Sequence, residues 1–119
     1  MVKKVAVFVF ADIETNEGLG RVVNAMITVK ELKEAGDEVQ LFFDGTGTRW
    51  LKELSKKDHK AHGLYESVKD RVAGACLFCA TVFGAKDSVQ KCNVKLVNEF
   101  EQHVSAKKLL SDEFQIMNF

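Results

Sequence analysis

Hydrophobic residues occur in five short runs along the chain, separated by segments in which apolar side chains recur every three or four positions. The runs are rich in β-branched and aromatic residues, which is typical of buried strands. The first run, Val5–Phe10, is apolar without interruption, as expected for a strand covered on both faces. The pattern predicts strands at 5–10, 39–43, 75–79, 94–97 and 114–119.

The intervening segments have the spacing of amphipathic helices. The clearest one runs from Leu19 to Leu32, with Asn16 or a neighbour as its expected cap. Gly36 follows it and suits the left-handed conformation that commonly ends a helix. Weaker patterns predict helices at 49–54, 61–72, 82–92 and 99–110.

Alternation of strands and helices predicts the α/β class and a single domain over residues 1–119. Crossover helices imply a parallel sheet, and the size suits a three-layer, flavodoxin-like sandwich with helices on both faces. We expect five strands in the common order 2-1-3-4-5. That order would bring the acidic loop of Asp12, Glu14 and Glu17 and the end of the third strand into one crevice. No internal repeat divides the chain.

Composition narrows the classes of partner. The 119 residues carry 17 basic and 17 acidic side chains, so nothing indicates binding to nucleic acid or to an anionic membrane. The longest apolar runs have six or seven residues, far fewer than the roughly 20 of a membrane span. The start Met1–Lys4 leads directly into the first strand rather than into a signal peptide. These features predict a cytoplasmic protein.

The candidate chemistry lies in Gly74–Ala80, where Cys76 and Cys79 have C-x-x-C spacing. A cysteine where a strand gives way to a helix is exposed to free N–H groups that favour the reactive thiolate. On a continuous strand the two residues would be about 10 Å apart, too far for a disulfide, whereas a helix beginning between them would bring them within reach. Cys92, on an apolar helical stripe, is expected to be a core residue.

Several familiar sites do not fit the chain. A thioredoxin-type oxidoreductase needs a cis-proline, and the sequence contains no proline. A structural zinc site needs a fourth ligand, and no second cysteine or histidine pair provides it. His59 and His62 fall in a lysine-rich surface stretch, and His103 is expected to be a lone helical histidine. We therefore expect no metal and no cofactor.

The sequence resembles the DsrE/DsrF-like family. The resemblance rests on the cysteine stretch Gly74–Ala80 with Gly84 beyond it, on the opening strand Val5–Phe10, and on the segment Ala35–Phe43. It covers nearly the whole chain. It implies a small flavodoxin-like protein that assembles into homo-oligomers, trimers or hexamers.

The resemblance also implies a function. Several members carry sulfane sulfur as a cysteine persulfide in an intracellular sulfur relay, and their persulfide cysteine matches Cys76 here, with Cys79 as the second cysteine. The expected function is that of a sulfurtransferase or sulfur carrier, with donor and acceptor proteins or small persulfides as partners. Two alternatives stay open: a non-catalytic oligomeric ligand-binding module, and a thiol/disulfide redox sensor.

Overall fold

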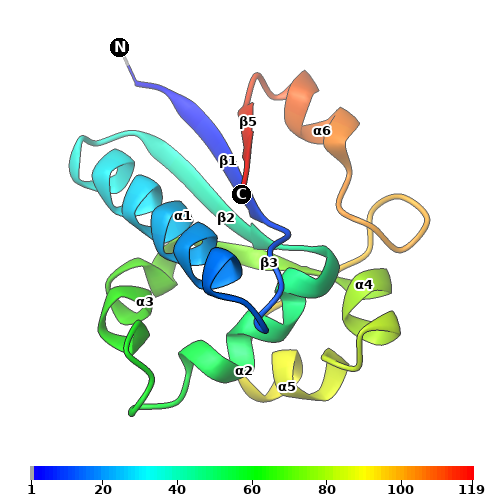
Figure 1. The fold of residues 1–119 in the computed structure, drawn as a ribbon. Helices are drawn as coiled ribbons and strands as arrows, with labels where there is room; N and C mark the ends of the chain where they lie inside the picture. Colours follow the sequence, from blue (N-terminus) through cyan, green and yellow to red (C-terminus); the bar gives the residue numbers. More distant parts are fainter. Residues whose placement is uncertain (1) are drawn as a thin grey trace.

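A computed structural model describes residues 2–119 and confirms the α/β class (Figure 1). The parallel strands are β1 (Lys4–Val9), β2 (Glu38–Phe43), β3 (Val72–Cys76), β4 (Leu96–Val97) and β5 (Gln115–Asn118). The helices are α1 (Asn16–Glu34), α2 (Trp50–Leu54), α3 (His62–Val68), α4 (Leu77–Val82), α5 (Lys86–Lys91) and α6 (Ala106–Ser111), with 3-10 turns η1 (Gly45–Arg49) and η2 (Lys69–Arg71). The fold is a flavodoxin-like sandwich.

The strand order is β4-β3-β2-β1-β5, so the predicted order 2-1-3-4-5 is wrong. Each strand from β1 to β4 is added beside the previous one, and the chain then returns across the whole sheet to place β5 against β1. An apolar run specifies that a segment forms a strand, but not which strand it pairs with. The winding therefore reverses between β1 and β5, and β2 separates the first strand from β3.

This order determines how the two faces of the sheet are covered. Right-handed crossovers in one direction place α1 to α5 on one face, whereas the return path places α6 on the other. Figure 1 shows α1 lying along β1 and β2, and α6 beside β5, apart from the other helices. Alternate residues of β1 accordingly enter two cores: Val7 packs in the larger cluster, and Phe8 packs in the smaller one under α6.

The long helix α1 agrees with its prediction. Thr15, next to the predicted Asn16, is the N-cap, and its hydroxyl accepts a hydrogen bond from Gly18 N–H at 2.9 Å. Gly36 follows the helix with a φ of 87°, in the left-handed region that glycine adopts without strain.

The third strand ends earlier than predicted. It stops at Cys76 rather than Cys79, and Leu77 begins α4. A short apolar run does not distinguish a strand from a buried helical turn, which is why the pattern placed the boundary too late. The helix predicted over 82–92 begins too early: Val82 is the last residue of α4, Gly84 with a φ of 71° separates the two helices, and only α5 (Lys86–Lys91) lies within the predicted range.

The helix predicted over 99–110 is also wrong in its first half. Residues 99–105 form a tight hairpin, and only Ala106–Ser111 is helical. Ser105 starts this helix because its hydroxyl accepts a hydrogen bond from Lys108 N–H at 3.1 Å. The lone helical histidine expected at position 103 therefore lies in a loop.

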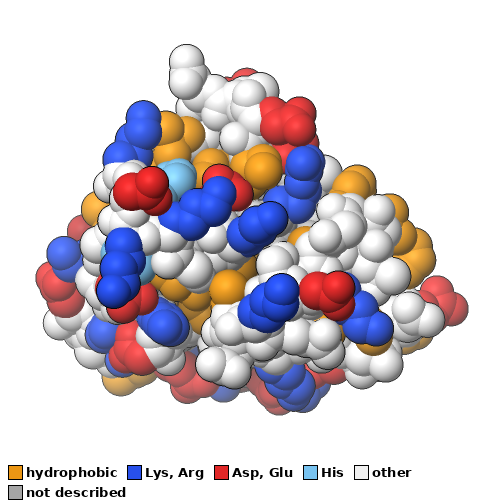
Figure 2. All heavy atoms as spheres, turned by 90° about the horizontal axis from the view of Figure 1, so that it is seen from below, with side chains coloured by type: hydrophobic (Ala, Val, Ile, Leu, Met, Phe, Trp, Pro, Cys, Tyr) orange, Lys and Arg blue, Asp and Glu red, His pale blue; other side chains and the backbone are white. Residues whose placement is uncertain are grey.

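The surface carries both signs of charge. Figure 2, which views the molecule from the side of α2, α3 and α5, shows Lys and Arg interspersed with Asp and Glu, with hydrophobic side chains between them. Among residues 2–119, no helix is both long enough and apolar enough to cross a bilayer.

Candidate active site

The site begins at the junction of β3 and α4. Cys76 is the last residue of the strand and the N-cap of the helix, and its Sγ accepts a hydrogen bond from the backbone N–H of Cys79 at 3.5 Å. Cys79 consequently lies in the first turn of α4. Of the two arrangements considered for the C-x-x-C pair, the structure has the one with a helix between the cysteines.

Gly74 sets the position of this junction in the sheet. A Cβ on this residue would lie 2.4 Å from Val97 Cγ2 and 2.9 Å from Lys95 O, closer than real side chains approach. The segment leading into β4 therefore packs against β3 at a distance that only glycine allows. The carboxyl end of β3, with Cys76, is held firmly between β2 and β4.

A hairpin with a two-residue turn brings a third polar side chain, that of His103, to the cysteines. Phe100 and His103 pair through two backbone hydrogen bonds of 3.1 and 2.8 Å. The central residues Glu101 and Gln102 have φ values of 47° and 70°, as a type I′ turn requires. Asn and Gly are the usual residues there, so the turn is strained at two positions, and such strain is concentrated at functional sites.

The hairpin docks on the start of α4. Phe78 N–H donates to Gln102 O at 2.9 Å, and the Phe78 ring lies 4.7 Å from the His103 ring. This contact places His103 Nδ1 3.3 Å from Cys76 Sγ. Sequence reasoning missed His103 because the pairing joins residues 27 positions apart. The only local signal was the failure of residues 99–105 to keep helical spacing.

Three donor atoms now converge. The sulfurs of Cys76 and Cys79 and a ring nitrogen of His103 all lie within 4.8 Å of one another. Cys76 is fully buried, whereas Cys79 and His103 are half-buried. Two thiolates and an imidazole are ligands that zinc prefers, although a closed structural zinc site takes four. This set could hold a soft metal ion with one position left for solvent or substrate.

The two thiols are electrostatically unequal. Burial, the neighbouring Asp44 carboxylate and Cys76 raise the pKa of Cys79 from an ordinary 9.0 to about 12, against the opposing influence of Gly45 N–H. At neutral pH Cys79 is therefore a thiol. The sulfur of Cys76 instead lies 3.3 Å from His103 Nδ1, accepts a hydrogen bond from the Cys79 N–H and donates one to Gln102 O at 3.7 Å.

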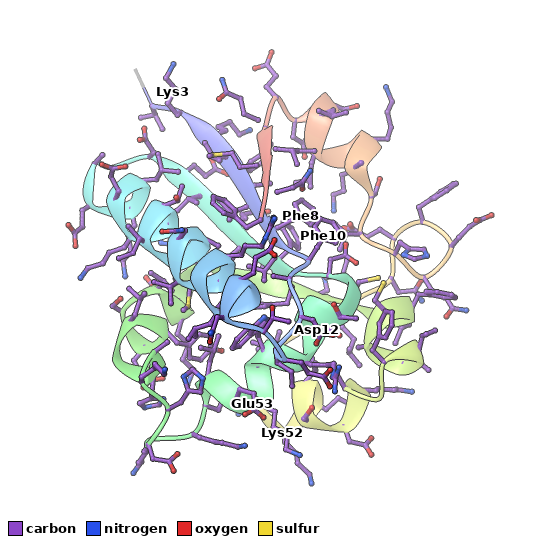
Figure 3. All side chains as sticks on the ribbon, in the orientation of Figure 1. Lys3, Phe8, Phe10, Asp12, Lys52 and Glu53 are labelled. Carbon is purple, nitrogen blue, oxygen red and sulfur yellow. The ribbon has the colours of Figure 1, made fainter. Side chains whose placement is uncertain are left out.

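The acidic loop after β1 does not join the cysteines. Asp12 and Glu14 pair with Arg49 at 3.1 and 3.4 Å, and Figure 3 shows Asp12 on the loop that leads into α1. The predicted crevice between this loop and the C-x-x-C pair is not formed, because β2 intervenes. Asp44, at the end of β2, takes the place near Cys79 that the sequence assigned to the loop.

The remaining candidates also lie elsewhere. His59 Nδ1 accepts a hydrogen bond from Ala61 N–H at 3.0 Å, and His62 Nδ1 lies 2.7 Å from Leu54 O. Their rings bind the backbone rather than each other. Cys92 packs half-buried against the larger core, with Ser55 Oγ 3.3 Å from its Sγ, in agreement with its expected core position.

No family model and no solved structure matches the chain. It is 33% identical over 115 residues to a protein of Methanocaldococcus jannaschii named "Uncharacterized protein MJ0733", and the match covers 96% of this chain and 93% of that relative. At this identity and coverage, the chain belongs to the same family as MJ0733.

Proposed function

We propose that the protein is a sulfur carrier or sulfurtransferase of the DsrE/DsrF-like type, and that Cys76 holds the transferred sulfur as a persulfide. The observation that carries the proposal is the 3.3 Å contact between Cys76 Sγ and His103 Nδ1. A nucleophilic thiol activated by a base within hydrogen-bond reach is the usual arrangement in covalent catalysis. His103 belongs to a hairpin with two strained backbone positions, and such strain is common at functional sites. This strain supports a functional role for the contact.

The loading step is an exchange between sulfurs. His103 takes the proton of Cys76, and the Cys76 thiolate attacks the outer sulfur of a donor persulfide, R–S–SH. A new S–S bond forms on Cys76, the donor S–S bond breaks, and the donor leaves as the thiolate R–S⁻. The product, Cys76–S–SH, then passes its outer sulfur to an acceptor thiolate by the same exchange in reverse. No external oxidant or reductant is needed.

Cys79 determines how long the persulfide survives. A Cys79 thiolate would attack the Cys76 sulfur of the persulfide, forming a Cys76–Cys79 disulfide and releasing HS⁻. Because the pKa of Cys79 is raised to about 12, very little of that thiolate exists at neutral pH. The raised pKa of Cys79 thus favours a sulfur carrier, in which the persulfide persists, over a redox pair, in which Cys79 would release the sulfur as HS⁻.

The proposal includes a cytoplasmic location and a homo-oligomer. Support for the oligomer comes from α4, where Phe78 and Val82 lie one helical turn apart and are 43% and 58% exposed. Apolar side chains exposed together on one helix face commonly mark an interface. These residues flank the cysteine site, so a second copy at this face would also limit access of water to it.

Mass spectrometry of the native protein tests the function. After treatment with a chelator, because three donors could hold a metal ion, the protein is incubated with inorganic polysulfide as the sulfur donor. We expect one added sulfur atom on Cys76. The variant His103→Ala should load about a hundredfold more slowly or more, because a general base contributes roughly 10²–10⁴-fold.

Cys92→Ser is the matched control, because it removes a half-buried thiol outside the site and should load normally. Cys76→Ser should lose the adduct, and Cys79→Ser should retain it. An adduct confined to Cys92, or none in the folded wild type, would contradict the proposed function and leave the non-catalytic module as the better interpretation.

A further inference from the structure

The direction of winding of the sheet changes at the pair of neighbouring strands β1 and β5. In open α/β sheets, ligands bind outside the carboxyl ends of the strands where the direction of winding reverses. That reversal lies between β1 and β5 in this protein. A cavity of about 280 Å³ is found there, on the face of the sheet that carries α6. We call it the β1–β5 slot, lined chiefly by Phe8, Phe10, Val104, Ile116, Asp44 and Asn118.

One wall of the slot is a stack of aromatic rings. Phe8 lies between Phe42 and Phe10, with ring centroids 4.9 and 5.9 Å away and rings nearly parallel. The outer member, Phe10, is 43% exposed, and Figure 3 shows it beside Phe8 at the carboxyl end of β1. The stack is thus open for a further flat or apolar group.

The backbone fixes this wall in place. Phe10 N–H donates to Phe119 O at 2.8 Å, and Thr46 Oγ1 donates to Phe10 O at 3.1 Å. A preformed wall binds a ligand without the entropic cost of ordering a loop. The slot is therefore a cavity that the fold itself holds in shape.

Two lining residues connect the slot to the cysteines. Asp44 is the carboxylate that raises the pKa of Cys79, and Val104 directly follows His103. A molecule whose body fills the slot would have its end at the edge of the cysteine site. Neither cysteine lines the slot itself, so it is suited to hold the unreactive part of a substrate.

We propose that the β1–β5 slot binds the apolar body of a small organic thiol that accepts the outer sulfur from Cys76. This inference rests on the proposed function. The acceptor thiolate attacks the outer sulfur of Cys76–S–SH, the persulfide S–S bond breaks, the product R–S–SH forms, and Cys76 leaves as a thiolate. No proton or electron is gained or lost in the exchange.

A small acceptor fits the site better than a protein thiol. Cys76 has no exposed surface, which hinders a thiol held on the surface of another folded protein more than it hinders a small molecule. The slot, at about 280 Å³, is slightly smaller than the usual ligand pocket of about 300–1,000 Å³. Aromatic groups gain additional affinity by stacking, which favours an acceptor with a ring.

The test compares two primary thiols that differ in their bodies. Protein loaded with inorganic polysulfide is freed of excess donor and mixed with 2-phenylethanethiol or 2-mercaptoethanol at equal thiolate concentration. Mass spectrometry follows the loss of sulfur from Cys76 and the appearance of R–S–SH. We expect transfer to the phenyl compound to be about tenfold faster in the wild type.

Phe10→Ala should remove this preference, so that the ratio of the two transfer rates falls to about one. Phe83→Ala is the matched control, because Phe83 is 42% exposed and lies outside the slot. Equal rates for the two thiols in the wild type, or an unchanged preference in Phe10→Ala, would overturn the inference even though the protein loads sulfur.

A binding measurement separates this inference from the proposed function. 2-Phenylethanol, which has no thiol, is titrated against the unloaded protein and followed by NMR. Shifts confined to residues of the slot, absent in Phe10→Ala, support the slot whether or not Cys76 loads. An absence of shifts would overturn the inference. A sedimentation result in which Phe10→Ala dissociates an oligomer would also overturn it, since a second copy of the chain would then occupy the slot.

Discussion

At the residue scale, burial and then the side chain of Asp44 raise the pKa of Cys79 and so limit its ionisation. Because the pKa of Cys79 is raised to about 12, only about one molecule in a thousand carries its thiolate at pH 9, where an ordinary thiol is half ionised. In Asp44→Asn one cause of the raised pKa is removed, so the pKa falls. We expect alkylation of Cys79 at pH 9, mapped by mass spectrometry, to become about threefold faster or more.

The matched control for this prediction is Asp12→Asn. Asp12 is a half-buried carboxylate that also follows a strand, but it pairs with Arg49 rather than with Cys79. In the wild type, the alkylation rate should continue to rise up to about pH 12. Equal rates in the two variants, or a rate that levels off near pH 9, would show that Asp44 does not act on Cys79.

Tyr65 has a buried hydroxyl with no hydrogen-bond partner among residues 2–119. Removing an unpaired buried polar group should not destabilise the fold, so we expect Tyr65→Phe to gain about 1 kcal/mol in the free energy of unfolding. Urea unfolding followed by circular dichroism measures the change. A loss of stability would mean that the hydroxyl is hydrogen-bonded in solution.

Tyr65→Phe should also change how the free energy of unfolding depends on pH. Burial, followed by Cys92 and Glu66, raises the pKa of Tyr65 from 10.0 to about 12, so the folded state holds this proton more tightly than the unfolded state. The corresponding stability is complete below pH 10 and is lost as the pH rises towards 12. Tyr65→Phe should therefore lose less stability across this window than the wild type.

At the element scale, the hairpin of residues 100–103 holds His103 in a backbone conformation that is itself unfavourable. Gln102 has a φ of 70°, which costs a residue with a side chain about 1–2 kcal/mol, whereas glycine adopts it freely. After the entropic cost of glycine, Gln102→Gly should stabilise the protein by about 0.5–1 kcal/mol. Urea unfolding is again the measurement.

The contact made by Gln102 with Phe78 uses the backbone carbonyl, so the glycine variant should keep the site and load sulfur normally. Gln102→Ala serves as the comparison, because alanine retains the strain and should bring no gain. Equal effects of glycine and alanine would mean that the left-handed conformation carries no cost here.

Two glycines of α1 provide a matched pair for packing. A Cβ on Gly18 would lie 1.9 Å from the backbone oxygen of Asp12, whereas a Cβ on Gly20 would meet nothing within 4 Å. Gly18→Ala should therefore destabilise the fold by about 1–3 kcal/mol, and Gly20→Ala should stabilise it by up to about 1 kcal/mol. Thermal unfolding of both variants checks the opposite signs, and a shared sign would refute the close approach of α1 to the loop after β1.

At the scale of the whole molecule, the proposed oligomer depends on the exposed face of α4. Val82→Lys places a charge on this face and should reduce the sedimentation coefficient to that of a monomer, with the circular dichroism spectrum unchanged. Leu110→Lys is the control, because Leu110 is also 58% exposed but lies on α6. A monomeric wild type, or dissociation by both variants, would contradict an interface on α4.

The sequence by itself determined the α/β class, the long helix α1 with its terminal glycine, and the cysteine pair as the candidate chemistry. These features are local: side-chain periodicity, capping residues and spacing act within a few positions of one another. The same local information failed at the end of β3, because the apolar run around Leu77 continues from strand into helix without a change of pattern.

Only the tertiary structure decided the strand order, the position of His103 and the environment of Cys79. Each depends on a contact between distant parts of the chain: β5 beside β1, a hairpin packed on α4, and Asp44 beside Cys79. Such contacts are chosen by the packing of the whole core and by the right-handedness of crossovers, and no short pattern encodes them. The sequence therefore identified the two cysteines, and the fold placed Cys76 beside His103 and Cys79 beside Asp44.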